Sequence, residues 1–242
     1  MNRAPEPQAA SSRAPLEPAL RHRGSVLLLC ILTSGGLLLD LWSKRWAFRS
    51  LTSHDVLTVI PGVLSFRRSL NAGALFGWGK GWVPLFIVAS VVALGFVVYL
   101  FASSHRRQRL LHIALALILA GATGNLFDRA FIIADMVPGS VEGERHFIGK
   151  VVSDVPGEPL RIGEYPDGGD VRVYPAGTPV HSIGVVRDFI KIDLEIGGRE
   201  IWPWVFNVAD ALLVIGVVLL LIEFWVSGRR AARPAVGGEV PS

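Results

Sequence analysis

The chain has 242 residues, of which 51% are hydrophobic and only 18% charged. Soluble domains carry about 25% charged residues, so this composition argues against a soluble globule and excludes a disordered chain. The formal net charge is +4, and the basic residues are scattered at the ends of apolar blocks. A nucleic-acid binder usually concentrates them in one patch, so this class does not fit. The single cysteine, Cys30, excludes a disulfide within the chain and a cysteine-based metal site.

The N-terminal segment 1–23 is rich in Pro, Ala and Ser and carries four arginines, which predicts a disordered basic arm. An uncharged apolar block, 24–39, follows it. A basic region before an apolar region also fits a secretory signal peptide, but no small-residue cleavage site follows and three more apolar blocks do. We therefore interpret this block as a first membrane-spanning helix, at about 24–42.

The three further apolar blocks predict helices at about 81–104, 110–127 and 203–226. The block 201–222 contains one charged residue, Asp210, and the other two blocks contain none. A helix needs about 20 apolar residues to cross a bilayer, and all four blocks come close to that length. The sequence therefore predicts an all-α membrane protein, with four transmembrane helices in one domain over 24–226.

The basic residues predict how these helices are oriented. The arm, the turn at 103–109 and the tail at 227–242 together hold ten Lys and Arg in 46 residues. The two long connections, 43–80 and 128–200, hold fourteen in 111 residues. Because short cytoplasmic segments are enriched in Lys and Arg, we expect both termini in the cytoplasm and both long connections outside the membrane.

The outer connections contain strand-like runs. In the first connection, 56–60 and 63–68 flank a Pro-Gly turn, which is typical of a hairpin. The second connection contains a long insertion, 136–184, that is rich in Gly, Pro and acidic residues with short Val/Tyr pieces. We expect small β-rich outer elements here, with mobile tips. No internal repeat is evident.

Four aspartates fall on the outer side of the predicted topology. They are Asp40, Asp128, Asp188 and Asp210. Charges at membrane depth are costly and usually functional. Asp40 and Lys44 are four residues apart on a helix, which favours a structural ion pair. The orientation is predicted from Lys and Arg alone, so the position of all four aspartates on one side is an independent observation.

The residue types limit the chemistry of these acids. No histidine cluster accompanies them, so a zinc site is a weak interpretation. Two aspartates close together in a low dielectric cannot both ionise. Such a pair can deprotonate water and protonate a peptide carbonyl, as in aspartic proteases. The alternatives are a small proton-coupled transporter and a non-catalytic membrane scaffold with structural pairs.

Five sequence blocks resemble the motifs of the lipoprotein signal peptidases (signal peptidase II), in order. They are 40–44 (Asp-Leu-Trp-Ser-Lys against Asp-Gln-x-Thr-Lys), 71–76 (Asn-Ala-Gly-Ala-Leu-Phe against Asn-x-Gly-Ala-Ala-Phe), 121–129 (ending Gly-Asn-Leu-Phe-Asp-Arg against Gly-Asn-x-x-Asp-Arg), 186–190 (Val-Arg-Asp-Phe-Ile against Val-x-Asp-Phe) and 206–210 (Phe-Asn-Val-Ala-Asp against Phe-Asn-x-Ala-Asp). The last three blocks are specific when they occur together. The resemblance covers about 24–135 and 184–226.

The resemblance implies an aspartic endopeptidase of the bacterial inner membrane. Such an enzyme removes the signal peptide of a prolipoprotein, just before a diacylglyceryl-modified cysteine, with its active site at the outer leaflet. Asp188 and Asp210 carry over as the catalytic pair. The residues that carry over as substrate-binding are Asn71, Asn125, Arg129 and Asn207, and those that carry over as structural are Asp40, Lys44 and Asp128. The implied partners are the lipidated substrate, membrane lipids and a globomycin-like cyclic peptide inhibitor. The resemblance implies no metal and no cofactor.

The sequence departs from the family pattern in two ways. Leu41, Ser43 and Leu75 replace the usual Gln, Thr and Ala. The insertion 136–184 is much longer than the family norm and lies between two motif blocks. We expect the insertion to be tolerated or stabilising, and not to form a required lid.

Overall fold

The computed structural model describes residues 17–52, 54–73, 83–138 and 146–231. Several sequence predictions therefore lie outside the described residues. These are most of the basic arm, Leu75 and its neighbours in the block 71–76, the first residues of the helix predicted from 81, part of the insertion, and the tail from 232 onward.

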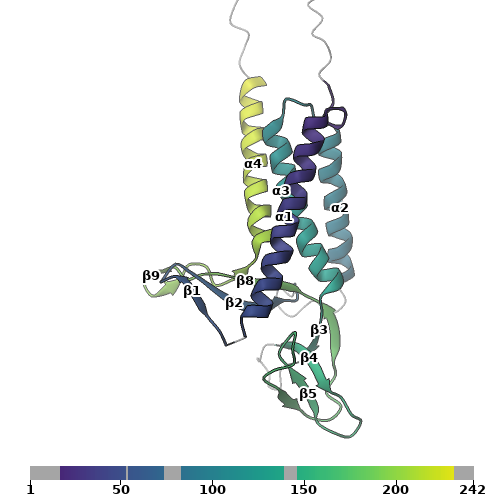
Figure 1. The fold of residues 1–242 in the computed structure, drawn as a ribbon, viewed down its shortest axis with the longest axis vertical. Helices are drawn as coiled ribbons and strands as arrows, with labels where there is room; N and C mark the ends of the chain where they lie inside the picture. The colour runs from purple at the N-terminus through teal and green to yellow at the C-terminus, as the bar shows by residue number, and fades with distance from the viewer. Residues whose placement is uncertain (1–16, 53, 74–82, 139–145, 232–242) are drawn as a thin grey trace, which may run out of the picture.

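Four helices form an elongated bundle (Figure 1). They are α1 (Arg23–Ser50), α2 (Val83–Ala102), α3 (Arg109–Phe131) and α4 (Val208–Ala231), preceded by a 3-10 turn, η1 (Ala19–Arg21). α3 is the central helix and packs against the other three. Among the described residues, α1, α3 and α4 are long and apolar enough to cross a membrane, and Ile87–Ala102 of α2 is a further apolar helical segment. This composition suits a membrane protein.

Eleven strands in three sheets also occupy the described residues, so the all-α prediction is wrong. They are β1 (Leu57–Ile60), β2 (Leu64–Asn71), β3 (Ile133–Val137), β4 (Phe147–Ser153), β5 (Leu160–Gly163), β6 (Arg172–Tyr174), β7 (His181–Gly184), β8 (Val186–Ile192), β9 (Glu195–Ile196), β10 (Arg199–Glu200) and β11 (Val205–Phe206). Most of these strands are only two to five residues long. Such short, partly exposed strands leave a weaker sequence pattern than 20-residue apolar helices do.

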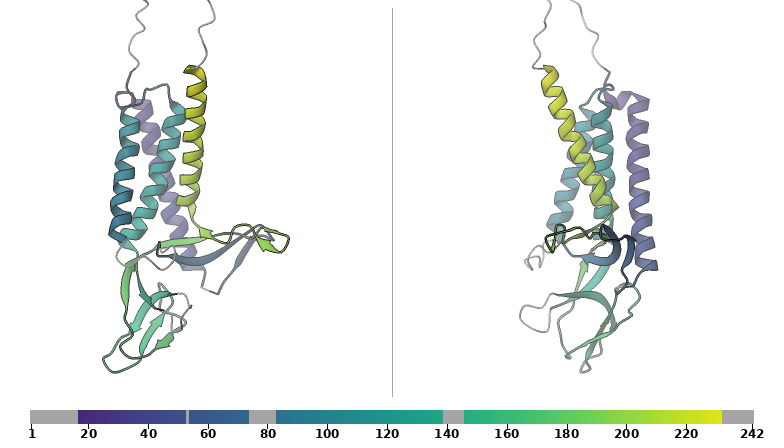
Figure 2. Two further views of the ribbon diagram at one scale, coloured as in Figure 1. Left: turned by 180° about the vertical axis from the view of Figure 1, so that it is seen from behind. Right: turned by 90° about the vertical axis from the view of Figure 1, so that its left-hand side faces the viewer.

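A four-stranded antiparallel sheet lies across one end of the bundle, in the order β1-β2-β8-β11. We call it the site sheet. Phe48 and Leu51, at the end of α1, pack on Phe189 of β8 and so fix the sheet to the helices. Figure 2 shows the sheet reaching sideways from the bundle, at the end opposite to the one where α1 begins and α4 ends. The β9-β10 hairpin forms the tip of this arm.

The insertion folds as a separate five-stranded sheet, in the order β6-β5-β4-β3-β7. Its own small core contains Val137, Leu160 and Ile162. β3 leaves the end of α3 and pairs with β7, which leads through Val185 into β8. The insertion therefore branches from the chain between α3 and the site sheet, and both of its ends lie side by side.

Candidate functional site

Eight of the nine residues proposed from the sequence form one connected polar network where the bundle meets the site sheet. They are Asp40, Lys44, Asn71, Asn125, Asp128, Asp188, Asn207 and Asp210. Segments from 40 to 210 thus converge at one place. The ninth residue, Arg129, lies in the last turn of α3, directly after Asp128.

Asp188 is held on β8, with only 2% of its surface exposed. Its Oδ1 accepts a hydrogen bond from Asn207 Nδ2 at 2.6 Å, and its Oδ2 accepts one from Asn71 Nδ2 at 3.1 Å. Asn71 reaches Asp188 because it ends β2, two residues after Ser69, which pairs with Asp188 in the sheet. The backbone N–H of Gly73 donates to Asn71 Oδ1 at 2.8 Å, so the Asn71 amide presents its N–H side to Asp188.

Asp210 is fixed by a reciprocal cap at the start of α4. The Asp210 backbone N–H donates to Asn207 Oδ1 at 3.0 Å, and the Asn207 backbone N–H donates to Asp210 Oδ2 at 3.1 Å. This capping box satisfies two backbone donors that a helix start would otherwise leave unpaired. A carboxylate in the first turn also interacts favourably with the helix dipole. Asn207 therefore contacts both acids, Asp188 with its side-chain amide and Asp210 with its backbone and side-chain oxygen.

Asn125 on α3 is oriented by Lys44. Lys44 Nζ donates to Asn125 Oδ1 at 3.1 Å, and Asn125 Nδ2 donates to Asp210 Oδ1 at 2.7 Å. A lysine can only donate, so the oxygen of the Asn125 amide must face Lys44 and its nitrogen must face Asp210. Asn207 Nδ2 also donates to the same Asn125 oxygen, at 3.2 Å.

Four charged residues form an ion-pair cluster directly behind these amides: Asp40, Lys44, Asp128 and Arg187. Lys44 Nζ lies 2.8 Å from Asp40 Oδ2 and 3.4 Å from Asp128 Oδ2, and all three side chains are fully buried. Arg187 Nη2 donates to Asp128 Oδ1 at 2.7 Å, and Arg187 Nε donates to Asp128 Oδ2 at 3.3 Å. Two cations thus compensate two carboxylates in a buried space.

The ion-pair cluster also fixes the packing of α1, α3 and α4. Asp40 Oδ1 accepts a hydrogen bond from the backbone N–H of Ala209 at 2.8 Å. Gly124 allows this close approach, since a Cβ there would lie 2.5 Å from Asp40 Oδ2. A Cβ at Gly121 would overlap the carbonyl oxygen of Ala209. Both positions therefore need glycine.

Asp188 and Asp210 differ from the cluster acids in their partners, and we call them the amide-held pair. Within the described residues, their hydrogen-bond donors are neutral side-chain amides and a backbone N–H. Burial is the largest influence on Asp188 and raises its pKa to about 7; the negative charge of Asp210 adds to this rise. Hydrogen bonds from Asn207 and Asn71 act in the opposite direction. At neutral pH the pair can therefore hold one proton.

Arg187 is the residue that the sequence analysis missed. Arg187 lies in the block 186–190, in which the resemblance implies a role for Asp188 alone. The available indication was the charge balance, since Lys44 alone cannot compensate both Asp40 and Asp128 in a buried space. The charge balance indicates that a second cation is needed, but it does not indicate which arginine supplies it.

The geometry suits acid–base chemistry on water. Asp210 is half-buried and Asp188 is buried, so one acid remains accessible while the other is desolvated. An ionised carboxylate can take a proton from water, and a protonated carboxyl can polarise a carbonyl.

Comparisons with known proteins agree with the sequence resemblance. The family model Peptidase_A8, described as signal peptidase (SPase) II, matches residues 32–226, which include all nine residues proposed from the sequence. The chain is 28% identical over 243 residues to the lipoprotein signal peptidase of Rhodopirellula baltica, covering 98% of this chain and 87% of that one. It is 28% identical over 220 residues to the lipoprotein signal peptidase of Geobacter sulfurreducens, covering 90% and 99%.

The fold is also similar to a solved structure described as a bacterial membrane enzyme determined by the in meso method at 2.3 Å resolution. The TM-score is 0.56 at 22% sequence identity, and the match covers 88% of this chain and 94% of that one. At this identity the likeness concerns the fold alone.

Proposed function

Because the chain belongs to the signal peptidase II family, we propose that Asp188 and Asp210 are the catalytic pair of an aspartic endopeptidase. Membership makes the protein a membrane peptidase that processes prolipoproteins. The proposed cleavage site is the peptide bond just before the diacylglyceryl-modified cysteine. The observation that carries the proposal is Asn207, which holds both acids where the bundle meets the site sheet.

In the proposed mechanism, Asp188 carries the proton and Asp210 is ionised. The Asp210 carboxylate takes a proton from a water molecule, which attacks the scissile carbonyl. The Asp188 carboxyl donates a hydrogen bond to the carbonyl oxygen and stabilises the developing charge. The carbonyl oxygen takes the Asp188 proton, which gives a tetrahedral diol. As the diol collapses, the C–N bond breaks, Asp210 passes its proton to the leaving nitrogen, and the ionised Asp188 takes a proton back from the diol. No covalent acyl-enzyme forms. The raised pKa of Asp188 supports this assignment of roles.

The neighbouring polar residues are the proposed substrate-positioning groups. Asn71 lies beside Asp188 and is exposed, so its amide is available to the substrate backbone. Asn125 and Asn207 fix the orientation of the two acids through the hydrogen bonds described above. Arg129 lies at the end of α3, next to this site, and we assign it to a carbonyl or phosphate oxygen of the lipidated substrate.

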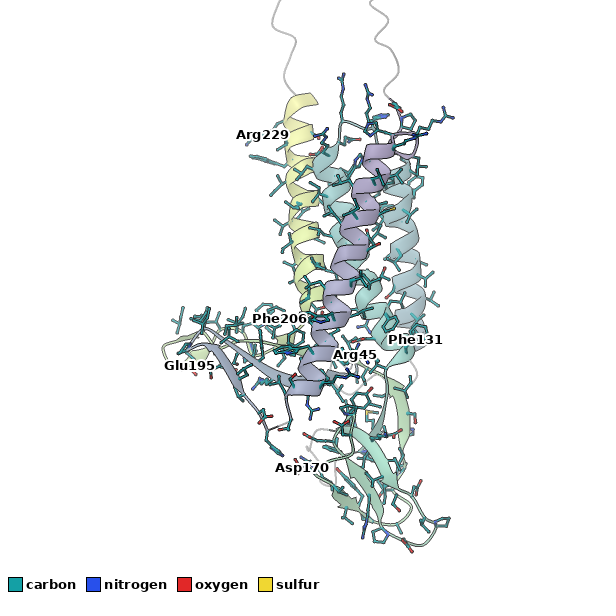
Figure 3. All side chains as sticks on the ribbon, viewed as in Figure 1. Arg45, Phe131, Asp170, Glu195, Phe206 and Arg229 are labelled. Atoms are coloured by element: carbon teal, nitrogen blue, oxygen red, sulfur yellow. The ribbon has the colours of Figure 1, made fainter. Side chains whose placement is uncertain are left out.

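We propose that the protein is a multi-pass protein of the bacterial cytoplasmic membrane, with α2 as the fourth span. Both termini then face the cytoplasm, and the site lies at the outer leaflet. The arrangement of Figure 3 supports this, because Arg229 lies at one end of the bundle and Phe206, at the site sheet, lies at the other. A lipid-anchored substrate can then enter sideways from the bilayer. A globomycin-like cyclic peptide would compete for the same site.

The test is cleavage of a lipidated prolipoprotein by purified enzyme in vesicles. Asp188→Asn and Asp210→Asn should each lower the rate by about 10²–10⁴-fold, because each removes one proton-transfer group. Asp154→Asn, at an exposed position of the insertion, is the matched control and should cleave like the parent. Thermal unfolding must show that all three variants fold. Parental activity in either catalytic variant would refute the proposal.

A further inference from the structure

Three side chains that can bind a metal ion meet between the insertion and the chain that follows α1. His54 lies in the connection from α1 to β1, whereas Glu164 and Asp170 lie in the segment between β5 and β6. One potential ligand atom of each residue lies within 4.8 Å of those of the other two. Figure 3 shows Asp170 on the side of the insertion that faces this connection. More than a hundred residues separate His54 from the two acids, so no spacing motif marks the group.

The distances within the group suit a tetrahedral zinc site after small side-chain rotations. His54 Nε2 and Asp170 Oδ2 are 3.0 Å apart. Bonds of about 2.0–2.2 Å to a tetrahedral zinc ion place neighbouring ligand atoms roughly 3.3–3.6 Å apart. The side chains of His54 and Asp170 are 77% and 62% exposed, so both are free to turn by this amount.

Glu164 gives independent evidence for a cation. Its side chain is only 14% exposed, and its Oε2 accepts a hydrogen bond from Arg68 Nη2 at 2.9 Å. Its other oxygen, Oε1, is buried and has no hydrogen-bond partner among the described residues. A buried carboxylate oxygen without a partner is unfavourable, and a bound cation would remove that penalty.

Arg68 does not compete with a cation for this oxygen. It is fixed by a second hydrogen bond, from Arg68 Nη1 to the carbonyl oxygen of Phe48 at 3.3 Å, and it engages only one oxygen of Glu164. It thereby orients the carboxylate in the way that outer partners orient metal ligands.

We propose that His54, Glu164 and Asp170 bind a divalent transition-metal ion of the zinc class. One imidazole and two carboxylates form the kind of donor set that zinc accepts, whereas calcium and magnesium prefer oxygen ligands alone. Water completes the coordination. His146 is the alternative fourth ligand, since it lines a cleft together with His54 and Glu164. The bound ion ties the insertion to the connection between α1 and β1.

The position of this tie gives it a structural consequence. The adjoining cleft has a volume of about 370 Å³ and is also lined by Ser69 and Leu70. These residues directly precede Asn71, which contacts Asp188. The ion therefore fixes the insertion beside the end of β2 that reaches the amide-held pair.

Cobalt binding to the full-length protein in detergent, after treatment with a chelator, tests the site directly. Titration with Co²⁺ should produce the visible d–d bands of a tetrahedral complex, with one ion per chain, and Zn²⁺ should displace it. His54→Ala and Asp170→Asn should each weaken Co²⁺ binding at least tenfold, since even outer-partner changes cost 10–100-fold in metal affinity. The matched controls are His181→Ala and Asp167→Asn, exposed positions of the insertion outside the group.

Thermal unfolding gives a second measurement. Zn²⁺ should raise the melting temperature of the parent and of both controls, because an ion that binds only the folded state stabilises it. It should not raise that of His54→Ala. Absence of tetrahedral bands at a stoichiometric concentration would overturn the proposal. So would equal loss of binding in His54→Ala and His181→Ala, which would indicate scattered surface histidines. Both exposed ligands can be replaced without disturbing the Arg68–Glu164 pair, so the test does not depend on a folded Glu164 variant.

Discussion

Two pairs of aspartates lie next to each other in this molecule, yet their surroundings differ in kind. Asp40 and Asp128 face Lys44 and Arg187, so their charges are compensated inside the protein. Asp188 and Asp210 are held by neutral amides and a backbone N–H. A buried acid with a cation keeps its charge and supports the structure, whereas a desolvated acid beside a second acid holds a proton near neutral pH.

Asn125 is the residue that joins the two groups. It accepts from Lys44 of the ion-pair cluster and donates to Asp210 of the amide-held pair. The cluster therefore sets the orientation of an amide at the proposed catalytic site without contacting the substrate. Variants in each group can show whether the ion-pair cluster mainly supports stability and the amide-held pair mainly supports activity.

The largest expected effect follows from breaking the ion-pair cluster. Lys44→Met removes the cation that Asp40 and Asp128 share, which should cost about 3–5 kcal/mol of stability. Thermal unfolding in detergent should show a large drop in melting temperature or loss of the folded protein. Adding Asp40→Asn to Lys44→Met should recover part of the loss. If the double variant is as unstable as the sum of the two single variants, the pair is not coupled.

Substitutions at Asn207 separate its role as the N-cap of α4 from its hydrogen bond to Asp188. Asn207→Ala removes both, and should cost about 1 kcal/mol of stability and lower the cleavage rate by roughly 10²-fold. Asn207→Ser keeps a good capping oxygen but removes the amide donor to Asp188. It should retain more of the stability than Asn207→Ala and still lose activity. Cleavage at the parental rate by Asn207→Ser would show that the hydrogen bond to Asp188 is unnecessary.

The dependence of activity on pH should report Asp188. Its pKa is raised to about 7, so the protonated form required by the mechanism is lost as the pH rises through that value. The value of kcat/KM should therefore fall about tenfold per pH unit above pH 7. The hydrogen bond from Asn71 lowers this pKa, so Asn71→Ala should move the falling limb to higher pH. Asp154→Asn should leave it in place. A limb that moves to lower pH in Asn71→Ala would contradict the assignment.

The smallest effect is expected from the insertion. Deletion of residues 137–182 with a short glycine linker should leave activity within a few-fold of the parent, because β3 and β7 lie side by side where the linker would join them. The melting temperature should fall, since the largely buried Arg68–Glu164 ion pair and the contact of Tyr165 with Phe48 are lost. Complete loss of activity in a folded, inserted variant would show that the insertion is required.

The helices and the polar residues could be predicted from the sequence, but the extent of the sheets could not. Long uncharged blocks mark helices because every turn contributes to the same pattern. The strands β9, β10 and β11 have two residues each, which is too short for any alternation to be visible. Their existence depends on pairing between distant segments, as when Phe206 pairs with Ile190.

The candidate site shows the same division. The sequence indicated which residue types gather on one side of the membrane, and the resemblance assigned them roles. The sequence could not indicate that Arg187 donates to Asp128 whereas its neighbour Asp188 accepts from Asn207. Adjacent residues on a strand point to opposite faces, so Arg187 reaches Asp128 on α3 while Asp188 reaches Asn207, which precedes α4.

That alternation on β8 bears on how such a chain can evolve. The insertion returns to the site sheet through Val185, and Arg187 is fastened to Asp128 on α3 before the chain reaches Asp188. These hydrogen bonds to Asp128 keep a movement or a change of length in the insertion from displacing Asp188. New segments can therefore be gained, lost or replaced before Val185 while the geometry of the acids stays as it is.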